Sequence, residues 1–481
     1  MLFSAAFAIS VVFETSADGT VLSMHAASAW YAASTMAALW LLARPAAAGR
    51  LLLLCAVLAV ALFLKMPRLP NHGFFDFVVA LTILCAALLA GWRRRALPDG
   101  ATLYAAFAPA VRWSVVVMYG WAVVHKLNAD FFDLEVSCGP RQLDEVRRYL
   151  RFLPAGQSMQ AFGIYGTLVV ETAIPLLLVF RRTRYAGIAL ALGFHYVLGA
   201  GYARFSAMLV AMLTLFVGAD LIDPVREAVR RRVSAHRLRR LRAAGVGLAA
   251  VGYGLVVAGN RAAQTPAITL HAVTQVWFVY GALAAALFAG AWGLRRRLVA
   301  DDRHPWRFPH PALAVVPVLM LVNGLTPHIG VKNTQAFAMY SNLRTEGGTS
   351  NHLFLPSALQ VFDQERDLVT IVSSSDRVLA LLARRQWHGS NYFYSYIAGN
   401  RDFDPAEAPA WQVPFASLRL RIADLARQGV RGVRVTYDRG GRRYATENAE
   451  RDPALARASL LERKLLFLRA VPMTEKSLCM W

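Results

Sequence analysis

The stretch TLYAAFAPAVRWSVVVMYGWAVVHKLNADFFD, residues 102–133, decides the fold class because it joins a long apolar run to a lysine. As a helix, the run from Tyr104 to Val124 is long enough to cross about 30 Å of hydrocarbon. Lys126 follows at the rim of this span, where an ammonium group is costly to desolvate and therefore indicates a functional role. A lysine that merely marks the helix end by snorkelling is the alternative.

The whole chain has the same apolar character. Its 481 residues are 56% hydrophobic, and a mean hydropathy of +0.39 places it in the membrane class. Residues 1–13 are apolar but lack the basic start and cleavage site of a signal peptide, so they are a further short span or an interfacial segment. The sequence therefore predicts an α-helical polytopic membrane protein with nine to eleven transmembrane helices, drawn from residues 1–13 and the spans 26–43, 50–66, 72–92, 102–125, 157–180, 185–201, 204–221, 244–260, 272–294 and 311–327.

The net charge of +22 does not indicate a nucleic-acid partner, because much of the excess lies in short loops between predicted spans. Taken in order, these loops all fall on one side of the membrane, which the positive-inside rule assigns to the cytoplasm. The loop 126–156 and everything after residue 328 then lie outside. The loops contain Arg93–Arg95, Arg181, Arg182, Arg184, the run from Arg226 to Arg242, and Arg295–Arg297.

The composition changes after the last span and divides the chain into two predicted domains. Residues 1–327 form a transmembrane helical bundle, and residues 328–481 form an extracytoplasmic domain of mixed α and β structure. Cys138 and Cys479 both fall outside, where a disulfide can persist, although the sequence leaves their pairing open. The elements expected in the second domain are strands at Leu368–Val372 and Val433–Tyr437, a turn at DRGGRR, and helices at Phe415–Gln428 and Pro453–Arg469.

Polar residues that are able to carry chemistry gather near the outer ends of the spans. Each group also has a plain structural explanation, as a helix cap, a partnered intramembrane side chain or a surface loop. No spacing of histidine, cysteine or acidic residues indicates a metal site, and no nucleotide-binding motif is present. The candidates are Asn71, His72, His125, Lys126, Asn128, Asp130, Asp133, Glu171, His195 and the loop 323–356, which includes Asn342 and Arg344.

Four of these stretches resemble one family. VVHKLNADFF is similar to the lysine–leucine–Asx segment of the vitamin K-dependent gamma-glutamyl carboxylases and of the bacterial proteins that share the horizontally transferred transmembrane (HTTM) domain. RLPNHGFFDFVVALTIL resembles a carboxylase helix with an Asn-His pair, GFHYVLGAGYARF the stretch with a phenylalanine–histidine pair, and AFAMYSNLRTEGGTSNHL a segment after the last span. The resemblance covers residues 20–356. His125 stands where the family often has a lysine, and the family's asparagine after His195 is missing.

The resemblance implies a membrane enzyme in the bacterial inner membrane. Lys126 would be the base during oxygenation of reduced vitamin K or menaquinone, with His72 and His195 as further catalytic residues. The quinone would contact Asn71, His125, Asn128, Asn342 and Arg344. The cofactors would be the lipophilic quinone, O2 and CO2, without a metal, and the partners would be membrane lipid and a protein or peptide glutamate.

Three alternatives remain beside this carboxylase, or lyase, activity, and one of them is an enzyme that modifies lipid. The chain would be a quinone epoxidase if carboxylation is lost, or a non-catalytic transporter or membrane scaffold of the HTTM family.

Overall fold

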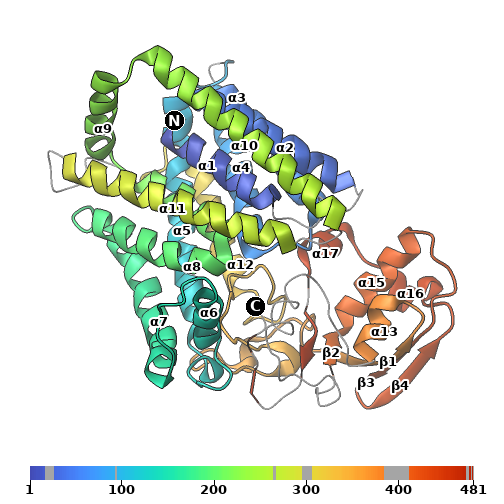
Figure 1. Ribbon diagram of the computed structural model, residues 1–481. Coiled ribbons are helices and arrows are strands. Elements are labelled where there is room, and N and C mark those ends of the chain that lie inside the picture. Colours follow the sequence, from blue (N-terminus) through green and yellow to red (C-terminus); the bar gives the residue numbers. More distant parts are fainter. Residues whose placement is uncertain are drawn as a thin grey trace.

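The computed structural model describes residues 1–16, 26–92, 95–263, 267–294, 306–383, 411–467, 469–472, 476, 477 and 479. A helical bundle fills one side of the molecule, and a small sheet with short helices lies beside one end of it (Figure 1). The bundle helices are α1 Leu2–Ser16, α2 Ala26–Ala43, α3 Ala48–Lys65, α4 Asn71–Trp92, α5 Gly100–Lys126, α6 Cys138–Arg147, α7 Gln157–Val179, α8 Arg184–Leu213, α9 Ala219–Arg232, α10 Ala235–Ala263, α11 Ala267–Leu294 and α12 Val315–Leu325.

Six helices within the described part of the chain are long and apolar enough to cross a membrane, which agrees with a polytopic helical protein. Three shorter apolar helices accompany them, at Leu2–Ser16, Ala29–Ala43 and Pro311–Leu325. The predicted span 244–260 lies within α10, which is not among these six segments. The six qualifying segments are Ala48–Lys65, Asn71–Trp92, Gly100–Lys126, Gln157–Val179, Arg184–Phe216 and Ala272–Leu294.

The two predicted spans 185–201 and 204–221 are joined in one helix, α8, which bends at Tyr202. This residue leaves the helical conformation, with φ −134° and ψ 47°. The rings of His195 and Phe205 lie 5.5 Å apart, whereas ten residues of a straight helix rise about 15 Å. The Tyr185 hydroxyl also donates a hydrogen bond to Asp220, at 2.6 Å. The chain therefore doubles back at Tyr202, and its two legs run side by side.

Helix α5 is the centre of the bundle, in contact with α4, α7, α8 and α12. Asp99 caps its first turn by accepting a hydrogen bond from the backbone N–H of Thr102, at 2.8 Å. Near this start, the Arg112 guanidinium donates to the carbonyl of Leu215, at 2.7 Å. The opposite end of α5 carries Lys126, and we call that end of the bundle the Lys126 end.

The predicted arginine loops lie near the start of α5. The Arg184 guanidinium donates to the carbonyl of Leu178, and the contact between Tyr185 and Asp220 brings the beginning of α9 to the same place. Most arginines of α9 and of the first turns of α10 are exposed. Arg93, Arg94 and Arg295–Arg297 lie outside the described residues.

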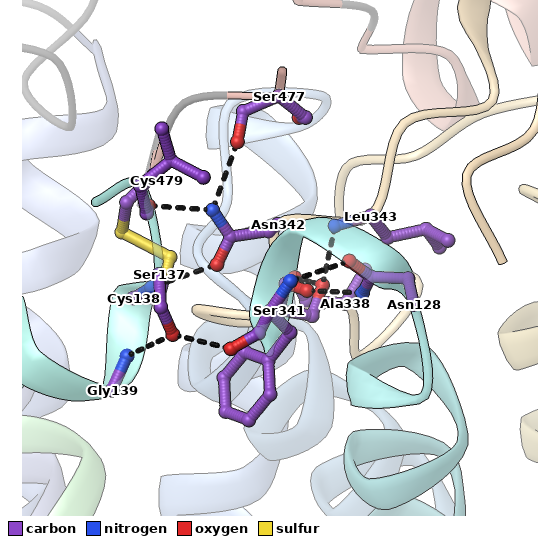
Figure 2. Close-up of a disulfide and its surroundings, with 12 residues drawn as sticks. Asn128, Ser137, Cys138, Gly139, Ala338, Ser341, Asn342, Leu343, Ser477 and Cys479 are labelled. Atoms are coloured by element: carbon purple, nitrogen blue, oxygen red, sulfur yellow. Dashed lines mark hydrogen bonds between the residues drawn. A yellow bond between two sulfur atoms is a disulfide. The ribbon is translucent and has the colours of Figure 1, made fainter. Parts of the chain in front are cut away.

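The residues that follow α12 return to the Lys126 end. The backbone N–H of Phe337 donates to the side-chain oxygen of Asn71, at 2.8 Å. Cys138 and Cys479, whose pairing the sequence left open, form a disulfide that ties the C-terminus to the start of α6 (Figure 2). The amide of Asn342 lies beside it, accepting from the Cys138 N–H at 2.7 Å and donating to the Ser477 carbonyl at 3.0 Å.

The C-terminal sheet confirms both predicted strands and the turn. Its order is β4-β3-β1-β2-β5, with antiparallel pairing throughout. Gly440 and Gly441 form the hairpin turn at φ values of 56° and 76°, a conformation that costs glycine little. Helix α15 Phe415–Arg427 confirms the helix predicted at Phe415–Gln428, and it packs on the sheet. The strands are β1 Leu368–Ser374, β2 Trp411–Pro414, β3 Val435–Arg439, β4 Arg442–Thr446 and β5 Val471–Pro472, and α13 Arg377–Ala383 is a further helix of this part.

The single helix predicted over Pro453–Arg469 is wrong. The segment forms two short helices, α16 Pro453–Ala456 and α17 Leu460–Leu465. Ser459 interrupts the first helix and begins the second through a capping box with Glu462, in which each side chain bonds the other's backbone N–H. Leucine spacing predicted the helical character but not this local cap.

Candidate functional site

Lys126 lies buried in the bundle and forms an ion pair with Glu171 of α7. Its Nζ donates to Glu171 Oε2 at 2.8 Å and to the carbonyl of Ala122 at 3.3 Å. Only 2% of Lys126 is exposed. A charge removed from water to this extent requires an opposite charge close by, and Glu171 supplies it.

The position of Glu171 along α7 shows how deep this pair lies. Helix α7 begins at Gln157 on the Lys126 side, so 14 residues, from 157 to 170, precede the carboxylate. They extend about 21 Å beyond the pair. The face of α7 away from the bundle carries exposed Phe162, Tyr165 and Leu176. The pair therefore lies in the middle of α7, next to a face of that helix that carries exposed apolar side chains.

His72 has a buried carboxylate partner that was not predicted from the sequence. His72 Nε2 lies 2.9 Å from Glu14 Oε2, and the guanidinium of Arg204 lies 3.8 Å from the same oxygen. A carboxylate oxygen can only accept, so the imidazole donates Nε2–H and its other nitrogen, Nδ1, keeps its lone pair if the ring is neutral. Glu14 thus selects both the orientation and the tautomer of His72.

His195 is held by a tyrosine of α5. The Tyr119 hydroxyl lies 2.7 Å from His195 Nε2, and both groups are buried. Tyr119 precedes Lys126 by seven residues, two helical turns, so the two side chains lie on the same face of α5. The ring of Phe205 lies 5.5 Å from that of His195 and 6.4 Å from that of His72.

The three predicted catalytic residues therefore lie along one row, in which ring contacts join His195 to His72 and a shared face of α5 relates Tyr119 to Lys126. Glu171 and Lys126 form its first part, Tyr119 and His195 the second, and Phe205 joins these to the third part, His72 with Glu14. The row crosses the interior of the bundle through helices α1, α4, α5, α7 and α8. Chemically it contains an amine, two carboxylates, a phenol and two imidazoles, a set suited to moving protons in a dry environment.

The three asparagines predicted to bind a cofactor tie backbone segments together. Asn71 receives the N–H of Phe337, and Asn342 lies beside the disulfide. The Asn128 amide donates to the carbonyls of His125 and Ser341, and its oxygen accepts from the N–H of Phe131 at 2.9 Å. With these bonds, their side chains stabilise the loops around the row and do not point into it.

His125 and Arg344 also lie outside the row. The His125 ring stacks on Trp121 at 5.1 Å and lies 5.3 Å from the ring of His328, which in turn lies 5.0 Å from His352. Burial lowers the pKa of His328 to about 4, so this histidine is neutral near pH 7. Arg344 is half-buried, and its backbone N–H donates to the Asn351 side chain at 2.9 Å.

A second buried lysine lies beside α4. The Lys332 ammonium lies 5.1 Å from the centre of the Phe74 ring, and burial lowers its pKa to about 8. Phe74 follows His72 by two residues in α4. From the sequence, Lys332 was only one polar residue of the loop 323–356.

Glu14 and Tyr119 are the polar members of the row that were not predicted from the sequence. Glu14 directly follows the apolar segment 1–13, so a carboxylate at the end of an apolar run was an available signal, as it was for Lys126. The sequence contains no such signal for Tyr119, since a tyrosine within a span is common. Across the described ranges, no group of three histidine, cysteine or acidic side chains is arranged to hold a metal ion.

The chain was compared with family models, curated proteins and solved structures, and none of the three comparisons gives a match.

Proposed function

We propose that the chain is a multi-pass membrane enzyme that acts on a reduced naphthoquinone and oxygen with Lys126 as the base, as its resemblance to the vitamin K-dependent carboxylases implies. The observation that carries the proposal is the buried Lys126–Glu171 pair in one row with His195 and His72. A transporter would instead favour broken helices with polar groups repeated in two halves of the chain.

The polar groups of the row suit a quinone with two hydroxyl groups. His195 Nδ1 and Glu14 Oε1 are buried and have no hydrogen-bond partner among the described residues, so they are polar atoms with which ligand hydroxyls can form hydrogen bonds. The surrounding rings of Phe205 and Phe194 offer an apolar contact for a quinone ring. When bound, the reduced quinone supplies the electrons and the acidic hydroxyl for reaction with oxygen.

Glu171 gives Lys126 a way to become a base. A proton that moves from Nζ to Oε2 over 2.8 Å leaves a neutral amine beside a neutral carboxylic acid. A low-dielectric site penalises the charged pair more than the neutral one, so burial makes this transfer less costly than in water. The neutral amine can then accept a proton, and Glu171 stores the first one until it is released.

In this proposal the two histidines bind and orient the quinone, and Lys126 starts the reaction. Glu14 keeps Nδ1 of His72 free to accept a hydrogen bond, and the Tyr119 hydroxyl fixes the ring of His195. Both imidazoles are therefore preorganised for a ligand that bridges them, which lowers the entropy lost on binding.

We further propose that the Lys126 end faces the outside of a bacterial inner membrane. The arginines of α9 and α10 lie at the opposite end, which the positive-inside rule assigns to the cytoplasm. The Cys138–Cys479 disulfide lies at the Lys126 end, and disulfides persist in oxidising compartments.

The test uses the purified protein in nanodiscs with reduced menaquinone or reduced vitamin K and oxygen, and follows epoxide by chromatography. We expect turnover in the wild type and in Lys476→Ala, an exposed lysine on the same face, but not in Lys126→Ala. Absence of epoxide from the wild type with both quinones contradicts the proposal. Addition of labelled CO2 and a glutamate peptide to an active preparation then separates a carboxylase from an epoxidase.

A further inference from the structure

Two exposed apolar elements lie at the Lys126 end, outside the spans. One is the segment 353–362, in which Phe354 is 71% and Val361 73% exposed. The other is α17, with exposed Leu460, Leu461 and Leu465. Soluble surfaces rarely leave this much apolar area in water, so both elements require an explanation.

The segment 353–362 is fastened to the ends of two bundle helices. Its first residue, Leu353, donates its N–H to the carbonyl of Leu127, the residue that follows α5, at 3.0 Å. At its other end, the N–H of Phe362 donates to the carbonyl of Ile329, four residues after α12, at 3.1 Å. The exposed side chains are thereby held at the level where α5 and α12 end.

Helix α12 indicates what surrounds the segment 353–362. Its side chains Val318, Leu319 and Val322 are exposed, as expected for a helix that faces lipid. With the preceding turn the helix runs from Pro311 to Leu325, about 24 Å, which is shorter than the hydrocarbon layer. The apolar segment 353–362 continues this lipid-facing surface beyond the end of the helix.

Helix α17 is attached in the same way to a different part of the bundle. The Lys464 ammonium donates to the carbonyl of Phe63 in the last turn of α3, at 2.8 Å, and lies 4.6 Å from the centre of its ring. Phe63 and Leu64 are themselves exposed and apolar. Figure 1 shows α17 at the edge of the C-terminal part nearest the bundle.

We infer that the segment 353–362 and α17 form a lipid-binding surface that inserts into the bilayer interface at the Lys126 end. Lipid is the occupant that the structure favours, because both elements are attached at helix ends and continue helix faces that are already apolar. Amphipathic elements of this kind bury their apolar side chains among headgroups and upper acyl chains, while Lys464 is positioned to reach the headgroups. The surface holds the C-terminal sheet against the membrane.

Spin labels in nanodiscs test this surface without reference to any activity. Cysteines are introduced singly at Phe354 and Leu461 in a Cys85→Ala background, since Cys85 is the exposed free cysteine among the described residues. The matched control is Tyr444→Cys, an exposed aromatic position on β4 away from the bundle. Collision rates with oxygen, which concentrates in lipid, are compared with those of a water-soluble nickel complex.

We expect the oxygen-to-nickel ratio at Phe354 and Leu461 to be several-fold higher than at Tyr444. Ratios equal to that of the control overturn the inference, because both elements would then lie in water. Low collision rates with both reagents overturn it too, since a second copy or another polypeptide would then cover the surface. Two test positions on separate elements keep the result decisive if one variant does not fold.

Discussion

Lys126 and Lys332 are both buried near the same end of the bundle, yet their surroundings treat the ammonium group in opposite ways. Lys126 has the Glu171 carboxylate at 2.8 Å. Lys332 has the face of Phe74 and a carboxyl group, Glu365, whose pKa is raised by its own burial and by the neighbouring Glu346. A carboxyl that is itself driven toward its neutral form stabilises a cation little. Burial alone therefore does not decide the charge of a lysine; the charge state of its neighbour does.

The two lysines differ in how each would act as a base. Lys332 would be the readier base in the resting protein, because its pKa of about 8 leaves a fraction of it neutral at pH 7. Lys126 becomes a base only when Glu171 takes its proton, but it is the lysine that lies in the row with His195 and His72. Variants at both lysines and at their neighbours decide which of these properties matters.

The largest expected effect is on turnover. Lys126→Ala should lower quinone epoxidation by about 10²- to 10⁴-fold, the usual contribution of a positioned general base. Lys332→Ala should retain most of the wild-type rate in the same nanodisc assay. The opposite pattern, loss in Lys332→Ala and survival in Lys126→Ala, would move the base to the second lysine.

The next effect concerns stability. Glu171→Leu should destabilise the protein by about 3–5 kcal/mol, because it leaves the buried ammonium of Lys126 without its carboxylate. Unfolding by denaturant in detergent micelles measures this change. The double variant Lys126→Met with Glu171→Leu should regain most of the loss, since it removes both charges. If the double variant stays as unstable as the single one, lost packing and not charge is responsible.

A pH dependence should distinguish Lys332. Its folded-state pKa of about 8 lies below the ordinary value of 10.5, so the unfolded chain binds more protons and stability rises with pH through this window. Lys332 should thus add about 2 kcal/mol to the unfolding free energy between pH 7 and pH 9.5. We expect Lys332→Met to lose this increment. Subtracting the variant's unfolding free energy from that of the wild type at each pH removes the contributions of all other titrating groups. Parallel curves would mean that Lys332 keeps its ordinary pKa.

The smallest effect is the contact between Lys332 and the ring of Phe74. A double-mutant cycle with Phe74→Leu and Lys332→Met should give a coupling of about 0.5–2 kcal/mol at pH 7, in the range of a partly desolvated cation–π interaction. The coupling should shrink at pH 9.5, where the amine is mostly neutral. A coupling that does not change with pH would assign it to apolar packing alone.

Several features of the fold were predictable because they depend on local composition. Long apolar runs indicate a membrane protein, since most of them approach the thickness of the hydrocarbon layer. The turn DRGGRR required a hairpin, because Gly440 and Gly441 accept positive φ values. Lys126 stood out because the cost of burying its charge can be read from its position after a span.

The partners of the candidate residues were not predictable in this way. In the sequence, Lys126 follows the end of a span, whereas Glu171 lies in the middle of another. The two residues were therefore expected at different depths in the membrane and were not predicted to pair. They meet because α7 extends well past the end of α5 on the Lys126 side, an offset between helices that no single helix encodes. The same holds for the Glu14–His72 pair, which joins residues 58 positions apart.

The sequence by itself determined a multispanning helical chain, the elements of a small sheet, and an amine and two imidazoles that are expensive to bury. Only the tertiary structure decided that α8 doubles back at Tyr202, that Cys138 bonds Cys479, and that Glu171, Tyr119 and Glu14 are the groups beside those side chains. The physical reason is that apolar periodicity and turn chemistry act within a few residues. Helix offset and rotation are set by packing between helices, and they alone determine which buried polar groups meet.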